Sequence, residues 1–139
     1  MTATGAIQQA AYTKLTGDTP LMTLLTGGIV DVRGIPTGQI YPFVALGDTT
    51  EVPNDRLGRN GYDTTMTLHI YSRQPGAKEC QTILARLNVL LNKQPLTLAG
   101  MHQVGAWYEF SQVMGDPSDD RITHMPVRYR IQAQEGTAS

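Results

Sequence analysis

The 139-residue sequence has little that marks a specialised class of protein. It contains one cysteine, so no internal disulfide can form and nothing ties the fold to an oxidising compartment. Only 17% of its residues are charged, below the usual level of about 25%. The 11 basic and 12 acidic residues leave a net charge of −1. This balance argues against a polybasic nucleic-acid binder and against an acidic disordered chain.

Long apolar runs and targeting signals are also missing. No stretch approaches the roughly 20 apolar residues that a membrane helix requires. The segment from Met1 to Ala6 lacks the basic and apolar regions of a secretory signal. We therefore expect no membrane partner and a protein made in a reducing cytoplasm. A chain of this size buries about 68% of its unfolded surface, which is sufficient for one domain with its own core.

Helical periodicity occurs in three places. The first two helices are short: one over residues 3–15, and one between Asp18, its expected N-cap, and Gly27. The third runs from Ala77 to Lys93. Its apolar residues follow a 3.6-residue period and form one stripe: Ala77, Cys80, Ile83, Leu84, Leu87 and Leu91.

The remaining chain is rich in strand patterns, which fall at residues 29–32, 42–47, 62–73, 96–99, 101–104, 106–114 and 122–134. Apolar and polar residues alternate most clearly in 62–73 and 122–134. In 106–114 the spacing places Trp107 and Phe110 on opposite faces. Residues 49–61 contain many turn-forming residues, so we expect a long loop there.

These elements predict an α+β fold. We expect an antiparallel sheet of about four main strands packed by one long helix, with two short helices at the N-terminus. The expected domain covers residues 1–134, and residues 135–139 are expected to form a disordered tail.

No pattern of catalytic or ligand-binding residues emerges. Cys80 lies within the apolar stripe, where a core role fits better than a reactive thiol. The three histidines, His69, His102 and His124, lie more than twenty residues apart and lack metal-ligand spacing. We expect them at surface positions on strands, and a cluster in the folded chain is the alternative. The aspartates near residues 116–120 lack the order of a calcium loop. We therefore predict no catalytic residue, no cofactor, no metal and no enzymatic activity.

The order of elements resembles the tail completion, or tail terminator, proteins of long-tailed bacteriophages, which join heads to tails. Two motifs carry most of the resemblance: Pro-Phe-Val at residues 42–44, and Ile-Tyr-Ser-Arg at 70–73 before the long helix. The helix start at 76–83, the segment 96–100 and Val-Arg-Tyr-Arg at 127–130 add to it. The resemblance covers roughly residues 4–134.

This resemblance implies a structural protein that is made in the host bacterial cytoplasm and incorporated into the virion. It implies a ring, commonly hexameric, at the head-proximal end of the tail tube. There the ring would stop tube growth and join the tail to the head connector. The implied partners are further copies of the chain, the major tail tube protein and the head–tail connector protein, without specific nucleic-acid binding. A minor connector adaptor and a monomeric protein-binding module remain alternatives.

Two groups of residues are candidates for such contacts. Glu51, Asp55, Arg56 and Arg59 lie in the expected 49–61 loop, which we predict to meet a neighbouring subunit, a tail partner or the ring lumen. Arg128 and Arg130 share one face of the last strand. That face is either an inter-subunit surface or a solvated outer face of the sheet.

Overall fold

The structure is a computed structural model that describes residues 3–55, 60–96, 98, 100–116 and 119–135. Its helices are α1 (Thr4–Thr16), α2 (Thr19–Leu24) and α3 (Lys78–Leu91), with a short 3-10 turn, η1 (Val32–Gly34). Its strands are β1 (Ile29–Asp31), β2 (Phe43–Pro53), β3 (Gly61–Ser72), β4 (Met101–Ser111), β5 (Met114–Asp116) and β6 (Asp119–Glu135).

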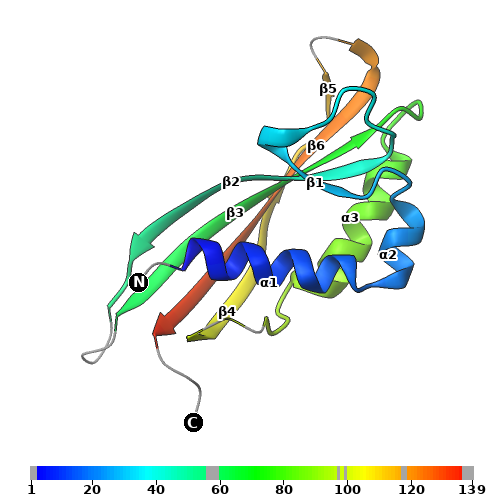
Figure 1. The fold of residues 1–139 in the computed structure, drawn as a ribbon. Helices are drawn as coiled ribbons and strands as arrows, with labels where there is room; N and C mark the ends of the chain where they lie inside the picture. The colour runs from blue at the N-terminus through cyan, green and yellow to red at the C-terminus, as the bar shows by residue number, and fades with distance from the viewer. Residues whose placement is uncertain (1–2, 56–59, 97, 99, 117–118, 136–139) are drawn as a thin grey trace.

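In the described part of the chain, six strands form one mixed sheet in the order β1-β2-β3-β6-β4, and β5 pairs with the start of β6. Strand β1 runs parallel to β2, and the other pairings are antiparallel. The long helices α1 and α3 lie on one side of this sheet (Figure 1). The α+β class is confirmed. The expected antiparallel sheet of about four strands is corrected to a mixed sheet of six.

The helix α1 has the length that the sequence predicts, but it is nearly as long as α3 and belongs to the same layer. It has 13 residues against 14 for α3. Its buried residues, Ile7, Ala11 and Leu15, recur every four positions and join the core formed by α3 and the sheet. Two helices therefore cover the sheet where the sequence predicted one.

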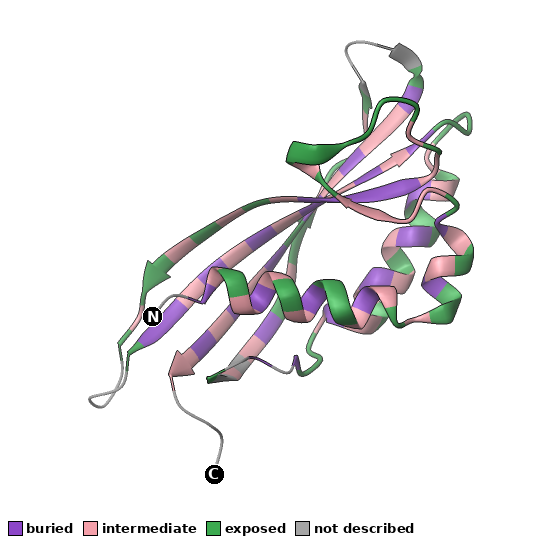
Figure 2. Cartoon of the chain, in the orientation of Figure 1, coloured by how far each residue is buried: buried purple, intermediate pink, exposed green. Residues whose placement is uncertain are grey.

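The core lies between these helices and the inner face of the sheet (Figure 2). Alternate residues of β3 are buried, as the sequence predicts, and β6 supplies the facing set. The helix α3 confirms the predicted stripe, with Cys80, Ile83, Leu87 and Leu91 buried. The long periodic segments therefore fold as their patterns indicate.

The prediction of a loop over residues 49–61 is wrong for the first half of this segment. Strand β2 continues to Pro53 and pairs with β3 from Phe43↔Tyr71 to Pro53↔Tyr62, with an irregularity between Leu46 and Thr49. Strand β1 pairs only with Val44–Leu46 of β2, so the rest of β2, up to Pro53, has β3 on one side and no strand on the other side. A polar edge strand has the composition of a loop, which explains the error.

Strand β4 also differs from the prediction. Residues 101–104 and 106–111 form one strand with two irregularities in its pairing with β6. The irregularity between Tyr108 and Phe110 inserts an extra residue, so Trp107 and Phe110 pair with Arg130 and Arg128 and share the outer face. The prediction that they lie on opposite faces is therefore wrong.

The predictions for the segments before β4 and at the end of β6 also differ from the structure in detail. Leu96 and Leu98 are buried but are not in a strand, while residues 97 and 99 lie outside the described residues. Strand β6 extends through Glu135, the first residue of the expected tail, and residues 136–139 lie outside the described residues. Among the described residues, no helix has the length and apolar character needed to span a membrane.

The outer edge of β4 is partly blocked by the chain that follows α3. The backbone N–H of Lys93 donates to the carbonyl of Ala106 at 2.9 Å. The backbone N–H of Tyr108 donates to Oδ1 of Asn92 at 2.8 Å. The middle of this edge is therefore occupied within the subunit.

Candidate subunit interfaces

The outer face of the sheet holds both arginines that the sequence suggested as interface residues. Arg128 and Arg130 alternate with the buried Val127 and Tyr129 on β6, so they point away from the helices. The Nε of Arg130 donates to Oδ1 of Asp63 at 2.8 Å, and its Nη2 contacts the other carboxylate oxygen. The hydrogen bond to Asp63 raises the pKa of Arg130. The pair neutralises the charge at this point of the face.

Two large aromatic residues lie beside these arginines. Phe110 is 40% exposed, and the guanidinium of Arg128 lies 5.3 Å from the centroid of its ring, a cation–π geometry. Trp107 is 38% exposed and lies against Gly105, where a Cβ atom would come within 2.5 Å of the indole. Tryptophan, phenylalanine and arginine are enriched in protein interfaces. We call Trp107, Phe110, Arg128 and Arg130 the outer-face patch.

A row of stacked rings crosses the other half of the outer face. The rings of Phe43 and Tyr71 are 4.9 Å apart, and those of Tyr71 and His124 are 4.5 Å apart. His69 Nδ1 lies 2.7 Å from His124 Nε2. Burial lowers the pKa of His69, and the carboxylate of Asp48 opposes this shift. The β3–β6 register therefore brings two of the three histidines together, although they lie far apart in the sequence.

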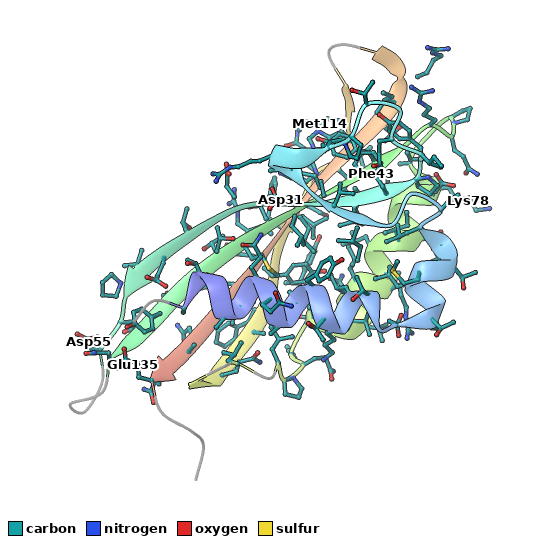
Figure 3. The ribbon with its side chains drawn as sticks, in the orientation of Figure 1. Asp31, Phe43, Asp55, Lys78, Met114 and Glu135 are labelled. Atoms are coloured by element: carbon teal, nitrogen blue, oxygen red, sulfur yellow. The ribbon has the colours of Figure 1, made fainter. Side chains whose placement is uncertain are left out.

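The acidic residues of the predicted loop make contacts within the subunit. Glu51 lies in β2, and its Oε1 accepts the backbone N–H of Ala3 at 2.6 Å, which fixes the chain just before α1. Oδ1 of Asp55 accepts the N–H of Gly61 at 3.1 Å, which joins the ends of the β2–β3 connection. Figure 3 shows Asp55 and Glu135 at the same end of the sheet.

The basic residues of this segment, Arg56 and Arg59, lie outside the described residues. At the start of β3, the hydroxyl of Tyr62 donates to Oε1 of Glu135 at 2.8 Å. This hydrogen bond raises the pKa of Tyr62 to about 12. Among the described residues, the structure therefore places Glu51 and Asp55 apart from the outer-face patch: Glu51 contacts Ala3 and Asp55 lies at one end of the sheet, whereas the patch extends over β6 and β4.

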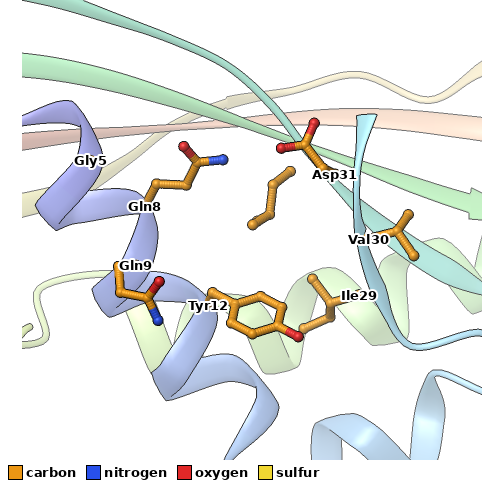
Figure 4. Close-up of a pocket in the computed structure, with 8 residues that line it drawn as sticks. Gly5, Gln8, Gln9, Tyr12, Ile29, Val30 and Asp31 are labelled. Carbon is orange, nitrogen blue, oxygen red and sulfur yellow. The ribbon is translucent and has the colours of Figure 1, made fainter. Parts of the chain in front are cut away.

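A groove between α1 and β1 was not expected from the sequence. Its cavity volume is about 340 Å³. The residues lining it are Gly5, Gln8, Gln9, Tyr12, Ile29, Val30, Asp31 and Leu46 (Figure 4). Figure 4 shows the side chains of Gln8 and Asp31 at the top of the groove and the ring of Tyr12 below them. Asp31 is the one ionisable carboxylate in this lining, so the groove is acidic. We call it the α1–β1 groove.

The side chains of Cys80 and of the described His, Asp and Glu residues are the candidates for catalytic or metal-binding chemistry. Cys80 is fully buried in the core, as expected, and burial raises the pKa of its thiol to about 11. A thiol with this pKa is not a nucleophile near neutral pH. In residues 3–55, 60–96, 98, 100–116 and 119–135, no group of three or more His, Cys, Asp or Glu side chains is placed to hold a metal ion.

Comparison with known proteins gives a consistent result. The family described as tail completion protein gp17 matches residues 9–133. The tail completion protein gp17 of Bacillus phage SPP1 is 28% identical over 129 residues, which cover 93% of this chain and 92% of that protein. A chain from the virion of a native gene transfer agent particle has a TM-score of 0.84 at 20% identity. That match covers 95% of this chain and 97% of the other.

The structural match shows the same fold, and the family match extends over most of the helices and strands described above. The resemblance on which the sequence-based expectations rested is thereby confirmed. The expectation of a protein without enzymatic activity is confirmed in the same way, because this family is structural. The chain belongs to the tail completion protein gp17 family of phage tail structural proteins.

Proposed function

We propose that this protein forms a hexameric ring at the head-proximal end of the phage tail tube. The ring stops growth of the tube and joins the tail to the head connector. Its partners are further copies of the same chain, the major tail tube protein and the connector protein. Membership of the tail completion family supports this proposal, as does the likeness in fold to a component of a gene transfer agent virion.

The observation that carries the proposal is the outer-face patch. Trp107 and Phe110 are both more than one-third exposed on a sheet face that α1 and α3 leave open. Arg128 and Arg130 lie across from them on β6. The Asp63 partner of Arg130 removes part of the cost of burying its charge against another protein. Such a patch suits protein contacts better than contact with nucleic acid.

A closed ring also requires two different surfaces on each copy. In a cyclic assembly with head-to-tail contacts, one patch of each subunit meets a different patch of the next. The outer-face patch and the α1–β1 groove lie on different sides of the sheet, since the groove is lined by a helix of the covered face. The molecule therefore offers separate surfaces for neighbours within the ring and for the tube or connector.

The assembly state tests this proposal. Light scattering on the purified protein, alone and mixed with purified tails, should detect a ring of about six copies. Phe110→Ala and Trp107→Ala should each weaken ring formation or tail binding at least tenfold while leaving the fold unchanged. Val89→Ala is the matched control, because Val89 is an apolar residue of α3 that is 57% exposed and lies far from the patch.

Electron microscopy of particles lacking the protein distinguishes the alternatives. Overlong tails, whether or not they carry heads, support the terminator role. Normal tails without attached heads favour a minor connector adaptor. A protein that stays monomeric alone and with tails, in particles of normal form, contradicts the proposal and favours a monomeric binding module.

A further inference from the structure

The η1–β2 loop, which we define as residues 35–40, exposes two isoleucines. Ile35 is 38% exposed and Ile40 is 59% exposed. Figure 2 shows most of this loop as exposed. From Gly34 to Pro42 the sequence contains no Asp, Glu, Lys, Arg or His. The loop is therefore an apolar surface that another protein can cover without burying a charge.

Hydrogen bonds hold the η1–β2 loop against the segment before β1. Nε2 of Gln39 donates to the carbonyl oxygen of Gly27 at 2.8 Å and to that of Ile40 at 3.0 Å. The backbone N–H of Gly27 donates to the carbonyl oxygen of Pro42 at 2.9 Å. Because these bonds order the loop within the subunit, a contact with a partner loses less conformational entropy than a contact made by a free segment.

The η1–β2 loop and the outer-face patch belong to opposite edges of the sheet. The loop follows β1 through η1, whereas Trp107 and Phe110 lie on β4. Strands β1 and β4 are the two ends of the strand order. Four strand spacings of about 4.8 Å place these edges about 19 Å apart. A copy placed beside the β4 edge of its neighbour can therefore present its own β1 edge, and the same contact can repeat around a ring.

The charges of the two surfaces favour contact between a loop and a patch. Two patches facing each other would bring Arg128 and Arg130 of both copies into one interface, and like charges disfavour such a pairing. Two facing loops would leave the exposed rings of Trp107 and Phe110 uncovered. A loop on a patch adds no charge to the interface and covers the isoleucines and the aromatic rings together, which buries apolar surface on both sides.

We infer that the η1–β2 loop of one subunit packs on the outer-face patch of a second copy, with Ile35 and Ile40 against Trp107 and Phe110. The contact joins two different surfaces, as a closed ring requires. Arg130 stays paired with Asp63 in its own subunit, so its charge is not left alone in the interface. This inference rests on the proposed ring and specifies the contact between its neighbouring copies.

Two variants, each with one damaged surface, test the contact. Ile40→Lys places a cation on the loop, and Phe110→Lys places one on the patch, so the two changes cannot compensate each other. Each variant alone should self-associate at least tenfold more weakly than the wild type while circular dichroism and thermal unfolding remain native. Val89→Lys is the matched control, because Val89 on α3 is 57% exposed, and it should associate as the wild type does.

A mixture of the two variants distinguishes this contact from other uses of the same surfaces. The Ile40→Lys copy keeps an intact patch, and the Phe110→Lys copy keeps an intact loop. Mixed in equal amounts, they should form a heterodimer and nothing larger, because only one intact loop and one intact patch are present in each pair. Light scattering, with and without purified tails, measures this, and two variants that remain separate in both conditions contradict the contact.

Cysteine pairing provides a test that leaves the apolar residues in place. One preparation carries Thr37→Cys in the loop, and a second, of different size because of a tag, carries Glu109→Cys beside Phe110. Both positions are exposed. After mixing and mild oxidation, we expect at least tenfold more mixed disulfide than from Ala85→Cys with Glu109→Cys. Ala85 is exposed on α3, and the native Cys80 is fully buried and does not compete.

The outcomes separate this inference from the ring proposal. If the wild type forms closed rings but the mixture gives no heterodimer and the two crosslinking yields are equal, the inference fails and the ring proposal stands. If the heterodimer and the specific crosslink form but the wild type gives only open chains, the ring proposal fails and the contact stands.

Discussion

His69 and His124 share a hydrogen bond across β3 and β6, with Nδ1 of one ring 2.7 Å from Nε2 of the other. They are not direct partners in the strand register, where His69 faces Pro126 and His124 faces Tyr71. The contact is therefore diagonal, and the stacked ring of Tyr71 holds His124 in position. It joins the middle of the sheet to the part of β6 that pairs with β5.

This pair predicts a dependence of stability on pH. Burial lowers the pKa of His69 below its ordinary value of 6.5, so the unfolded state binds more protons than the folded state as the pH falls below that value. The free energy of unfolding should therefore be highest above about pH 6.5 and should decrease as the pH falls through the lowered pKa. Urea unfolding at several pH values measures this slope. The slope should be shallower in His69→Asn, and identical slopes would contradict the prediction.

Gly47 lies against the same histidine. A Cβ atom at this position would lie 2.6 Å from Nε2 of His69 and 2.8 Å from the backbone oxygen of Thr67. The backbone oxygen cannot move aside as a side chain can, so we expect Gly47→Ala to lower the free energy of unfolding by about 1–3 kcal/mol. Gly34→Ala, where no atom lies within 4 Å, is the matched control. Equal stability of the two variants in urea would refute this close approach.

The packing of α3 on the sheet gives a third prediction. Leu87 is fully buried, whereas Val89 on the same helix is 57% exposed. Leu87→Ala should cost about 2–5 kcal/mol, because it leaves a cavity between α3 and the sheet. Val89→Ala should change stability by less than about 0.5 kcal/mol. Denaturant unfolding of both variants checks the difference, and similar losses would mean that the predicted stripe does not face the core.

Asp18 links α2 to α3 and provides a fourth prediction. Its Oδ2 accepts the N–H of Leu21 at 2.9 Å as an N-cap, and its carboxylate pairs with Arg86. The hydrogen bond to Arg86 is the main reason that the pKa of Asp18 is lowered from 3.8. The pair therefore stabilises the fold above about pH 3.8, and this contribution is lost as the pH falls through the lowered pKa.

Two substitutions separate the roles of this carboxylate. Asp18→Ala removes both the cap and the pair and should cost about 1–3 kcal/mol at neutral pH. Asp18→Asn keeps an acceptor for the N–H of Leu21, so its loss should be smaller and its stability should change less between neutral and acidic pH. Thermal unfolding at both pH values measures this. A wild type and an Asp18→Asn variant with the same acid sensitivity would count against the pair.

Cys80 gives a prediction that needs no substitution. Its thiol is fully buried among core residues, and its pKa is raised to about 11. A thiol reagent near neutral pH should therefore label it at least a hundredfold more slowly in the native protein than in urea. Rapid labelling of the native protein would show that α3 opens readily from the sheet.

The sequence was most informative where one pattern continued for several turns or strand repeats. The stripe of α3 and the alternation in β3 and β6 predict buried residues correctly, because a helix or strand with one apolar face has one stable orientation. The polar end of β2 could not be recognised, because an edge strand and a loop have similar compositions. The position of Phe110 on the outer face results from an extra residue in β4, and the alternation of apolar and polar residues gives no sign of that extra residue.

The candidate surfaces, too, could be predicted from the sequence only where a single strand pattern determines them. Arg128 and Arg130 were placed on one face by alternation alone, and the structure adds Trp107, Phe110 and Asp63, whose positions depend on strand register. The α1–β1 groove combines residues 5–12 with residues 29–31 and Leu46. No local pattern links these segments, because their proximity results from the packing of α1 beside the parallel pair β1 and β2.

The edges of the sheet affect how the subunit behaves before it is assembled. A long unpaired strand edge is a template for aggregation. Here β1 has three residues, β2 ends at Pro53, and the middle of the β4 edge is occupied by Asn92 and Lys93. Strand addition is therefore limited at β1 and at the middle of β4, and association there is left to side-chain surfaces.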